Sequence, residues 1–262
     1  INQNGYSTYN ENLADVIQFA RVGKKYVAVV LGNDSSPSLI IKDMQGTTVD
    51  SETTAYQDMI ILDLGFFDNG EYFWTTSLDI YGTVPNTIMH TFRVNMSNSG
   101  EISLGEALTY AIVYAGSKLN VISTQQLRLY DYRGTQDTSG AVLVYGWQLA
   151  DSQVSGSNAM LLFALAQSGG AEGINQLRLL SGKTDKRFTL PSSCVGAALY
   201  NKRVYAFSSD TIYRADVSAQ RFTAISLPGA LASRQVTGYL GMLSGGVALL
   251  SCDSDVYAVT LP

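Results

Sequence analysis

The feature that most constrains the fold of this chain is a repeat of about 44 residues that runs through its 262 residues. Six short apolar segments recur, and the distances between their first residues are 47, 46, 41, 44 and 43 positions. The segments begin at Tyr26, Phe73, Leu119, Met160, Val204 and Val247. A spacing this regular indicates a repeat protein, in which each unit buries its apolar surface against its neighbours.

Each period holds three or four short strand-like segments separated by turn residues. In the third unit, for example, we expect strands at 110–115, from Leu119, at 127–132 and at 141–147. The fourth unit is the least regular, because only the polar segment 151–156 precedes its apolar segment.

Turns between strands are expected where Asp or Asn is followed by Gly. The side chain of Asp can cap such a turn, and Gly adopts the positive φ that many turns require. The glycines that we expect at turns are Gly46, Gly100, Gly134 and Gly182.

Four short strands in a period of about 40 to 45 residues predict a blade of a β-propeller. We therefore expect an all-β protein whose residues 1–262 form one β-propeller domain of six four-stranded blades. The approximate blades are 11–52, 53–108, 109–150, 151–191, 192–230 and 231–262. The last unit lacks a fourth strand, so we expect residues 1–10 to supply it and close the ring.

Two other architectures remain open on the sequence. A seven-bladed ring would require further strands in the N-terminal segment and in the second unit. A pair of β-sandwich domains would give strands spaced by about 8 to 12 residues, without the longer period.

Charge and composition narrow the classes of partner. Only 15% of the residues are Asp, Glu, Lys or Arg, against about 25% in a typical soluble domain, which suits strands that are covered on both faces. The net charge of -5 disfavours nucleic acid and anionic lipid as partners. No run of 18 apolar residues occurs, so we expect no membrane insertion by this segment. Because the chain starts at Ile1 without a signal peptide, we interpret it as a processed or trimmed domain, for which an upstream anchor remains open.

The run VYAFSSDTIYRADV from Val204 resembles the repeats of pyrroloquinoline-quinone-like and related β-propellers. Those repeats carry a docking Trp after the turn Gly, and none of the expected turns named above has one, so we expect no quinone and no other cofactor. Repeats of the WD type match less well, because the chain has neither a Gly-His nor a Trp-Asp pair.

The stretch LDIYGTVPNTIMHTFRVNMSNSGEI from Leu78, with LRLYDYRGT and VYGWQL further on, resembles an uncharacterised family of clostridial bacteria. Its members are membrane-anchored, extracytoplasmic, propeller-like proteins. This resemblance implies an extracytoplasmic location at the cell envelope, and it implies no activity.

Residues with catalytic potential are few. The chain has one histidine, His90, and strand alternation puts it on the same face as Ile88 and Phe92. We interpret it as a packed imidazole whose nitrogens are hydrogen-bonded. Cys194 and Cys252 lie 58 positions apart, too far for a C-x-x-C metal site, so no metal is expected. They are interpreted as two small buried side chains, and one disulfide bridge remains the alternative.

Carboxylates near the expected inner strands carry the one enzymatic hypothesis, a carbohydrate-active enzyme that works in the central channel. Glycosidases need two acidic residues, about 5 to 5.5 Å apart in retaining enzymes and about 6.5 to 9.5 Å apart in inverting ones. The candidates are Asp15, Asp58, Asp63 and Asp151. The alternative is that these residues cap turns and are solvated.

The loops that lead from an outer strand to the next inner strand gather on one face of a propeller, where a ligand would bind. Tyr and Arg are favoured at such recognition surfaces. The candidate binding residues on these loops are Tyr56, Gln57, Asp58, Tyr110, Asp151, Gln153, Arg234 and Gln235. Our leading hypothesis is a non-catalytic binding or scaffold propeller for a protein, peptide or glycan. A glycoside hydrolase is the second hypothesis, and a sensor domain that signals to a membrane helix is the third.

Overall fold

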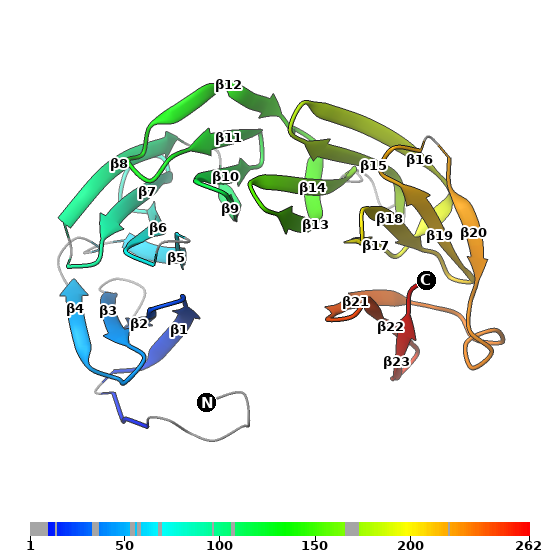
Figure 1. Cartoon of the computed structure of the whole chain (residues 1–262), viewed down its shortest axis with the longest axis horizontal. Helices are drawn as coiled ribbons and strands as arrows, with labels where there is room; N and C mark the ends of the chain where they lie inside the picture. The colour runs from blue at the N-terminus through cyan, green and yellow to red at the C-terminus, as the bar shows by residue number, and fades with distance from the viewer. Residues whose placement is uncertain are drawn as a thin grey trace. The chain divides into compact units, whose positions relative to one another are not determined.

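The computed structural model describes residues 10–13, 15–32, 37–52, 56, 59–67, 70–95, 97–105, 108–165, 173–219 and 221–262. Throughout these ranges the regular elements are β-strands, and they form six antiparallel sheets, five with four strands and one with three (Figure 1). The chain divides into two compact units, residues 1–143 and 144–262, and each unit contains three of the sheets. None of the described residues belongs to a helix that is long and apolar enough to cross a membrane.

In the first unit, strands that follow one another in the chain pair as antiparallel neighbours, so each sheet is a meander. The first sheet consists of β1 (Ile17–Val22), β2 (Tyr26–Leu31), β3 (Ser38–Asp43) and β4 (Thr48–Glu52). The second consists of β5 (Met59–Phe66), β6 (Tyr72–Asp79), β7 (Asn86–Arg93) and β8 (Ser97–Gly105). The third consists of β9 (Thr109–Ala115), β10 (Lys118–Ser123), β11 (Gln126–Tyr130) and β12 (Gln136–Leu143).

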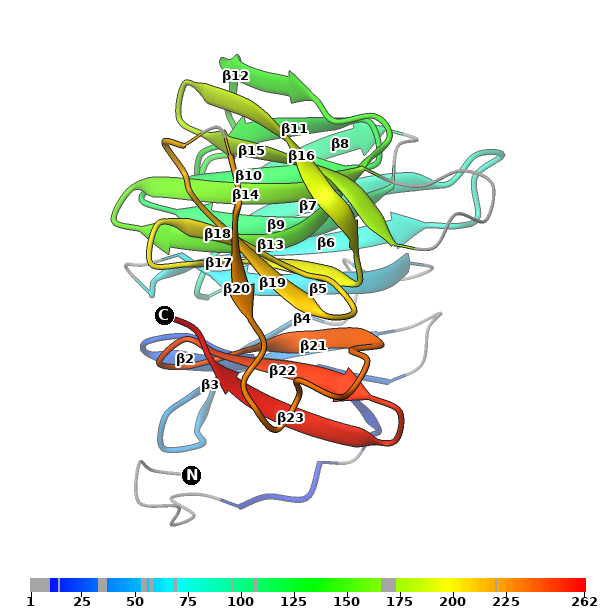
Figure 2. The same cartoon turned by 90° about the vertical axis from the view of Figure 1, so that its right-hand side faces the viewer.

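The second unit repeats this organisation, and its strands lie side by side within each sheet in both views (Figure 2). The fourth sheet consists of β13 (Trp147–Ser155), β14 (Asn158–Leu165), β15 (Ile174–Ser181) and β16 (Thr184–Cys194). The fifth consists of β17 (Gly196–Tyr200), β18 (Arg203–Phe207), β19 (Thr211–Asp216) and β20 (Thr223–Ser226). The sixth has three strands, β21 (Gly238–Leu243), β22 (Val247–Cys252) and β23 (Asp255–Thr260).

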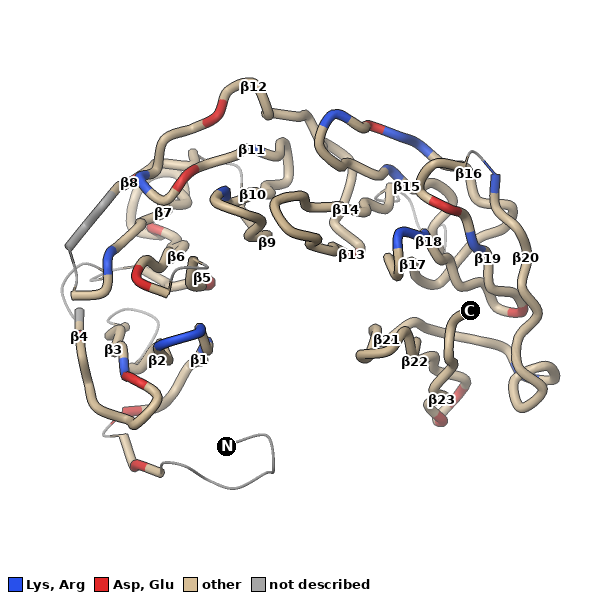
Figure 3. Tube along the Cα trace, viewed as in Figure 1, with Lys and Arg blue, Asp and Glu red and all other residues tan. Residues whose placement is uncertain are grey.

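The cores lie between neighbouring sheets within each unit, and the middle sheet of each unit is covered on both faces. Because successive strand residues point to opposite faces, Phe73 packs into the core shared with the first sheet, whereas Trp74 packs into the core shared with the third. In the second unit, Val204 faces the fourth sheet and Tyr205 faces the sixth. This two-sided burial explains the low charge content. Figure 3 shows several of the remaining charges on strands such as β12 and β16, each the last strand of its sheet.

The six apolar segments of the repeat coincide with the second strand of each sheet, and the all-β prediction is confirmed. The expected boundary between residues 150 and 151 falls inside β13, because Trp147 begins that strand instead of ending the one before it. A turn separates the two, in which Gly146 has a φ of 80° and the Trp147 amide donates to the carbonyl oxygen of Val144 over 2.8 Å.

The turn chemistry agrees with the sequence at most positions. Oδ1 of Asp43 accepts the amides of residues 45 and 47 at 2.9 and 2.8 Å, and Oδ1 of Asp131 accepts those of residues 133 and 135 at the same distances. Gly46, Gly134 and Gly182 have positive φ, as expected. The expectation for Gly100 was wrong: it lies within β8.

Candidate functional site

A cavity of about 310 Å³ lies in the first unit, among the first strands of its three sheets. It is lined by Arg21, Leu62, Asp63, Thr76, Leu108, Thr109, Tyr110, Ala111 and Ile112. These residues come from β1, β5, β6, β9 and the position before β9, so the cavity depends on the packing of all three sheets.

An ion pair joins two of these sheets at the cavity. The Arg21 Nη2 atom lies 2.8 Å from Oδ1 of Asp63, and the side chains are 47% and 39% exposed. The pairing of β5 with β6 is irregular between Ile61 and Asp63, and Oδ1 of Asp63 also accepts the Leu64 amide over 2.9 Å. The position of this carboxylate is therefore set by its own backbone as well as by Arg21.

Hydroxyl groups and an aromatic ring complete the polar lining. Thr109 is 4% exposed, and its Oγ1 has no hydrogen-bond partner among the residues that the structure describes. The Thr76 hydroxyl donates to the Asp63 carbonyl oxygen over 3.4 Å. Tyr110 is 40% exposed. A buried hydroxyl without a partner is unfavourable, and because this oxygen is closed off from solvent, the polar groups that the cavity presents are those of Arg21 and Asp63.

A second polar cluster lies in the second unit, around Asp151 on β13. Its Oδ2 accepts the Leu199 amide from β17 over 2.7 Å, and its Oδ1 accepts the Ser152 amide over 2.7 Å. Burial raises the pKa of the Asp151 carboxyl, against the opposing effect of these two bonds. Burial, with a smaller contribution from Asp151, raises the pKa of Tyr239 to about 12. Oδ2 of Asp151 thus joins the first strands of two neighbouring sheets, whereas Oδ1 bonds within its own strand.

The candidate binding residues are distributed over both units. Tyr110 lines the cavity, and Asp151 and Gln153 share β13, where the buried Oε1 of Gln153 has no partner within the described part of the chain. Arg234 and Gln235 are exposed before β21, where Arg234 bonds to Asp255 over 3.0 Å.

Tyr56 does not lie on a surface. It is 0% exposed, and its hydroxyl shares a hydrogen bond of 2.8 Å with Oγ1 of Thr75 in the core between the first two sheets. Gln57 and Asp58 lie outside the described residues.

Sequence reasoning missed Arg21, Thr109 and Tyr239. Arg21 lies on a strand close to Lys24 and Lys25 and is not distinguished from them by the sequence, and Thr109 and Tyr239 are ordinary strand residues. Their significance comes from the sheets that meet around them, which no local pattern in the sequence reveals.

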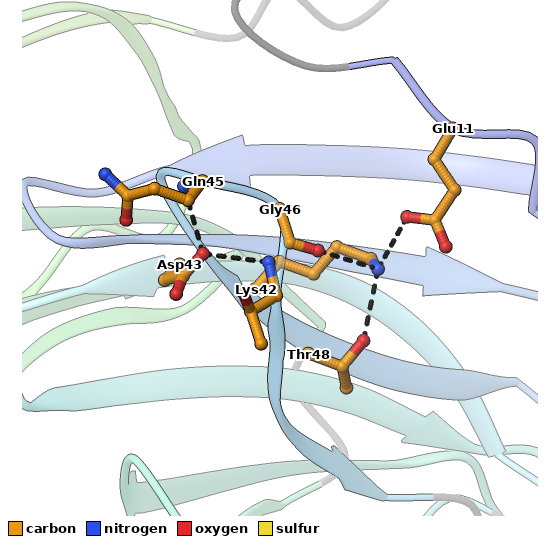
Figure 4. A network of polar contacts seen from close by, with 7 residues as sticks. Glu11, Lys42, Asp43, Gln45, Gly46 and Thr48 are labelled. Atoms are coloured by element: carbon orange, nitrogen blue, oxygen red, sulfur yellow. Dashed lines mark hydrogen bonds and ion pairs between the residues drawn. The ribbon is translucent and has the colours of Figure 1, made fainter.

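The buried Lys42 belongs to a structural network instead of a site (Figure 4). Its Nζ atom lies 2.7 Å from Oε2 of Glu11, 3.1 Å from Oγ1 of Thr48 and 3.3 Å from the carbonyl oxygen of Gly46. An ammonium has three donors, and these contacts match that number. The network attaches the segment around Glu11 to the first sheet.

The histidine and cysteines are also packed into the structure. His90 is 6% exposed, and its ring lies edge-on to Tyr56 and stacks near Phe92. Nε2 lies 3.4 Å from Oε2 of Glu101, whereas the buried Nδ1 has no partner in the described ranges, so only one of its two nitrogens has the contact that we expected. Cys194 and Cys252 are free, buried thiols, and burial raises the pKa of Cys194 to about 12. The described residues contain no group of three or more His, Cys, Asp or Glu that could hold a metal.

No protein-family model matches this sequence, and no curated protein shows significant similarity to it. Similarity appears among solved structures. The β-propeller domain of the Trilobed protease from Pyrococcus furiosus, which has an open velcro topology, matches with a TM-score of 0.51 at 10% identity, over 92% of this chain and 83% of that one. The Pan2 WD40 domain of Neurospora crassa matches with a TM-score of 0.53 at 9% identity, over 89% of this chain and 71% of that one. A prolyl endopeptidase matches with a TM-score of 0.58 at 12% identity, over 94% of this chain and 41% of that one.

Identities this low establish the fold and nothing more. The chain has a β-propeller fold, and proteins with a similar fold include both a WD40 domain and the propeller domain of a protease.

Proposed function

We propose that this chain is a non-catalytic, extracytoplasmic binding module, and that the cavity beside Arg21, Asp63 and Tyr110 is its ligand site. The observation that carries the proposal is the composition of this cavity. It combines an oriented ion pair with a partly exposed aromatic ring. A concave site with a few convergent polar groups is the usual form of a small-ligand site.

The bonding of the acidic residues favours binding over hydrolysis. Asp63 is the one carboxylate among the described residues that line the cavity, and it is bonded to Arg21 and to the Leu64 amide. A glycosidase needs a second carboxyl group within about 10 Å of the first.

A carbohydrate-active enzyme is the second candidate function. The observation that favours it is Asp151, a buried carboxyl whose raised pKa is a property of general acids. Its two bonds to backbone amides favour a structural role instead.

Binding and hydrolysis are separated by testing the purified chain against glycan and peptide arrays and against a panel of glycosidase substrates. Binding that is lost in Asp63→Asn, together with no turnover of any substrate, is the expected result. Hydrolysis that disappears in Asp63→Asn or Asp151→Asn would overturn the non-catalytic assignment.

We further propose that the six sheets are the blades of one ring and that residues 1–10 complete the last blade. Support comes from the sixth sheet, which has three strands where the other five have four. On its outer strand β23, Val256 is 57% exposed. The seven-bladed alternative would need one more sheet than the six that the described residues form.

Hydrogen exchange of the β23 amides tests this closure. In the full chain, the amides that do not bond to β22 should exchange slowly, and deletion of residues 1–9 should make them exchange fast, while the amides of β22 serve as a control. Equal and fast exchange in both proteins would rule out pairing with the N-terminal segment.

The extracytoplasmic location rests on the resemblance to the clostridial family of anchored propellers, and we propose that the chain is related to that family. Its native source cells, fractionated and probed with an antibody to this chain, should contain it outside the cytoplasm. Recovery in the cytoplasmic fraction alone would contradict the proposal.

A further inference from the structure

The charge of the cavity selects for a neutral ligand. Among the described residues that line it, Arg21 is the one cation and Asp63 the one anion, and they are paired at 2.8 Å. A free carboxylate or phosphate that paired with Arg21 would leave Asp63 unpaired beside a second negative charge. An ammonium that paired with Asp63 would leave Arg21 unpaired beside a second positive charge. A neutral ligand with hydrogen-bond donors and acceptors can bind both residues and leave the pair intact.

The hydrogen-bonding groups of the cavity match hydroxyl groups. The contacts of the Asp63 carboxylate with Arg21 and with the Leu64 amide both fall on Oδ1, so Oδ2 can accept a hydrogen bond from a ligand. The guanidinium of Arg21 donates through several N–H groups. Two neighbouring hydroxyls on one ring can donate to such a carboxylate and accept from such a guanidinium at the same time.

The volume of the cavity and its aromatic wall also suit a small ligand that carries hydroxyl groups. At about 310 Å³ the cavity is at the lower end of the range for small-molecule sites, about 300 to 1,000 Å³. Tyr110 presents a ring that is 40% exposed, and the C–H face of a sugar ring is apolar enough to pack against an aromatic side chain.

We infer that this cavity binds a neutral sugar residue at the end of a glycan, through the Arg21–Asp63 pair and the ring of Tyr110. This inference rests on the proposed binding function and names its ligand class. Specificity follows from the paired charges: a sugar that carries a carboxylate binds more weakly than its neutral counterpart.

The test measures binding of glucose, galactose, mannose, N-acetylglucosamine and glucuronate to the full chain by calorimetry and by ligand-observed NMR. We expect at least one neutral sugar to bind in the millimolar range or tighter, and glucuronate to bind more weakly than glucose. Glucuronate binding more tightly than every neutral sugar would overturn the inference.

Two variants connect binding to the cavity. Asp63→Asn should weaken the affinity for the neutral sugar about tenfold or more, because a charge-assisted hydrogen bond is lost. The matched control is Asp216→Asn. Asp216 is an exposed acid outside the cavity that is also paired with an arginine, at 3.1 Å from Arg203. The Asp216→Asn variant should bind the sugar with the affinity of the wild type.

Failure of the inference and failure of the proposed function give different results. If no sugar binds but a peptide or amino acid does, with a loss in Asp63→Asn, the ligand class is wrong and the binding function stands. If no ligand of any of these classes responds to Asp63→Asn, both are wrong.

Discussion

Burial of titratable groups has opposite consequences at two residues, His90 and Asp151. Burial lowers the pKa of His90 from 6.5, because it disfavours the charged imidazolium more than Glu101 favours it. Burial raises the pKa of Asp151 from 3.8, because it disfavours the carboxylate. In both residues the neutral form is favoured on folding, and the stability of the protein must therefore depend on pH in two separate ranges.

For His90, the unfolded chain binds more protons than the folded one at pH values between the lowered pKa and 6.5. The contribution of the neutral His90 side chain to the free energy of unfolding is therefore complete above about pH 6.5, and it is lost as the pH falls through the pKa of His90 in the folded protein. We expect the thermal midpoint of the wild type to fall between pH 7.5 and 5.5, and His90→Gln to show a smaller fall. The same pH dependence in both proteins would show that His90 is not the titrating group.

For Asp151, the folded chain binds more protons, so its contribution to stability declines as the pH rises from about 3.8 through the raised pKa. Asp151→Asn removes this dependence, but it also replaces one of the two accepting oxygens with an NH₂ group that faces a backbone amide. We expect a net loss of about 1 to 3 kcal/mol in the free energy of unfolding at pH 7, measured with urea. Asp216→Asn, a surface control, should change it by less than about 1 kcal/mol.

At the scale of the strand, the second strands of the sheets are the most strongly determined elements. In β6, the second strand of the middle sheet of its unit, neighbouring residues enter different cores. Phe73→Ala should lower the free energy of unfolding by about 3 to 5 kcal/mol, because the ring is fully buried. Tyr81→Ala, at a residue that is 64% exposed after the same strand, should have little effect in the same urea titration. Equal effects would contradict the assignment of Phe73 to a core.

The elements could be predicted from the sequence because strand alternation and turn chemistry are local. The border between β12 and β13 could not, because Leu143 to Trp147 is mostly apolar and only the positive φ of Gly146 marks the turn.

The site was predictable only in part. Tyr110 could be found because it lies beside an expected loop, whereas its neighbours Arg21 and Thr109 depend on contacts between sheets. Tyr56 was assigned to a surface for the same reason: its hydrogen bond with Thr75 joins residues 19 positions apart.

At the scale of the whole chain, the division into units suggests where a protease will cut first. Leu143 and Tyr145 flank the position where one unit ends and the other begins, and they are 73% and 82% exposed. Limited digestion with chymotrypsin should therefore cut early after Tyr145, and mass spectrometry of the fragments identifies the site. Tyr145→Ser should slow this cleavage, and an unchanged rate in this variant would show that the first cut lies elsewhere.

The two-sided burial of β6 also determines which changes in chain length the protein can accept. One residue inserted between Tyr72 and Phe73 would turn Phe73 and Trp74 to the opposite faces of the sheet. Every later side chain of the strand would then point into the other core. One residue inserted after Asp79, where Ile80 to Pro85 are exposed and connect β6 to β7, changes no register. Differences in length between this chain and its natural variants should therefore be confined to such connections, with strand lengths held constant.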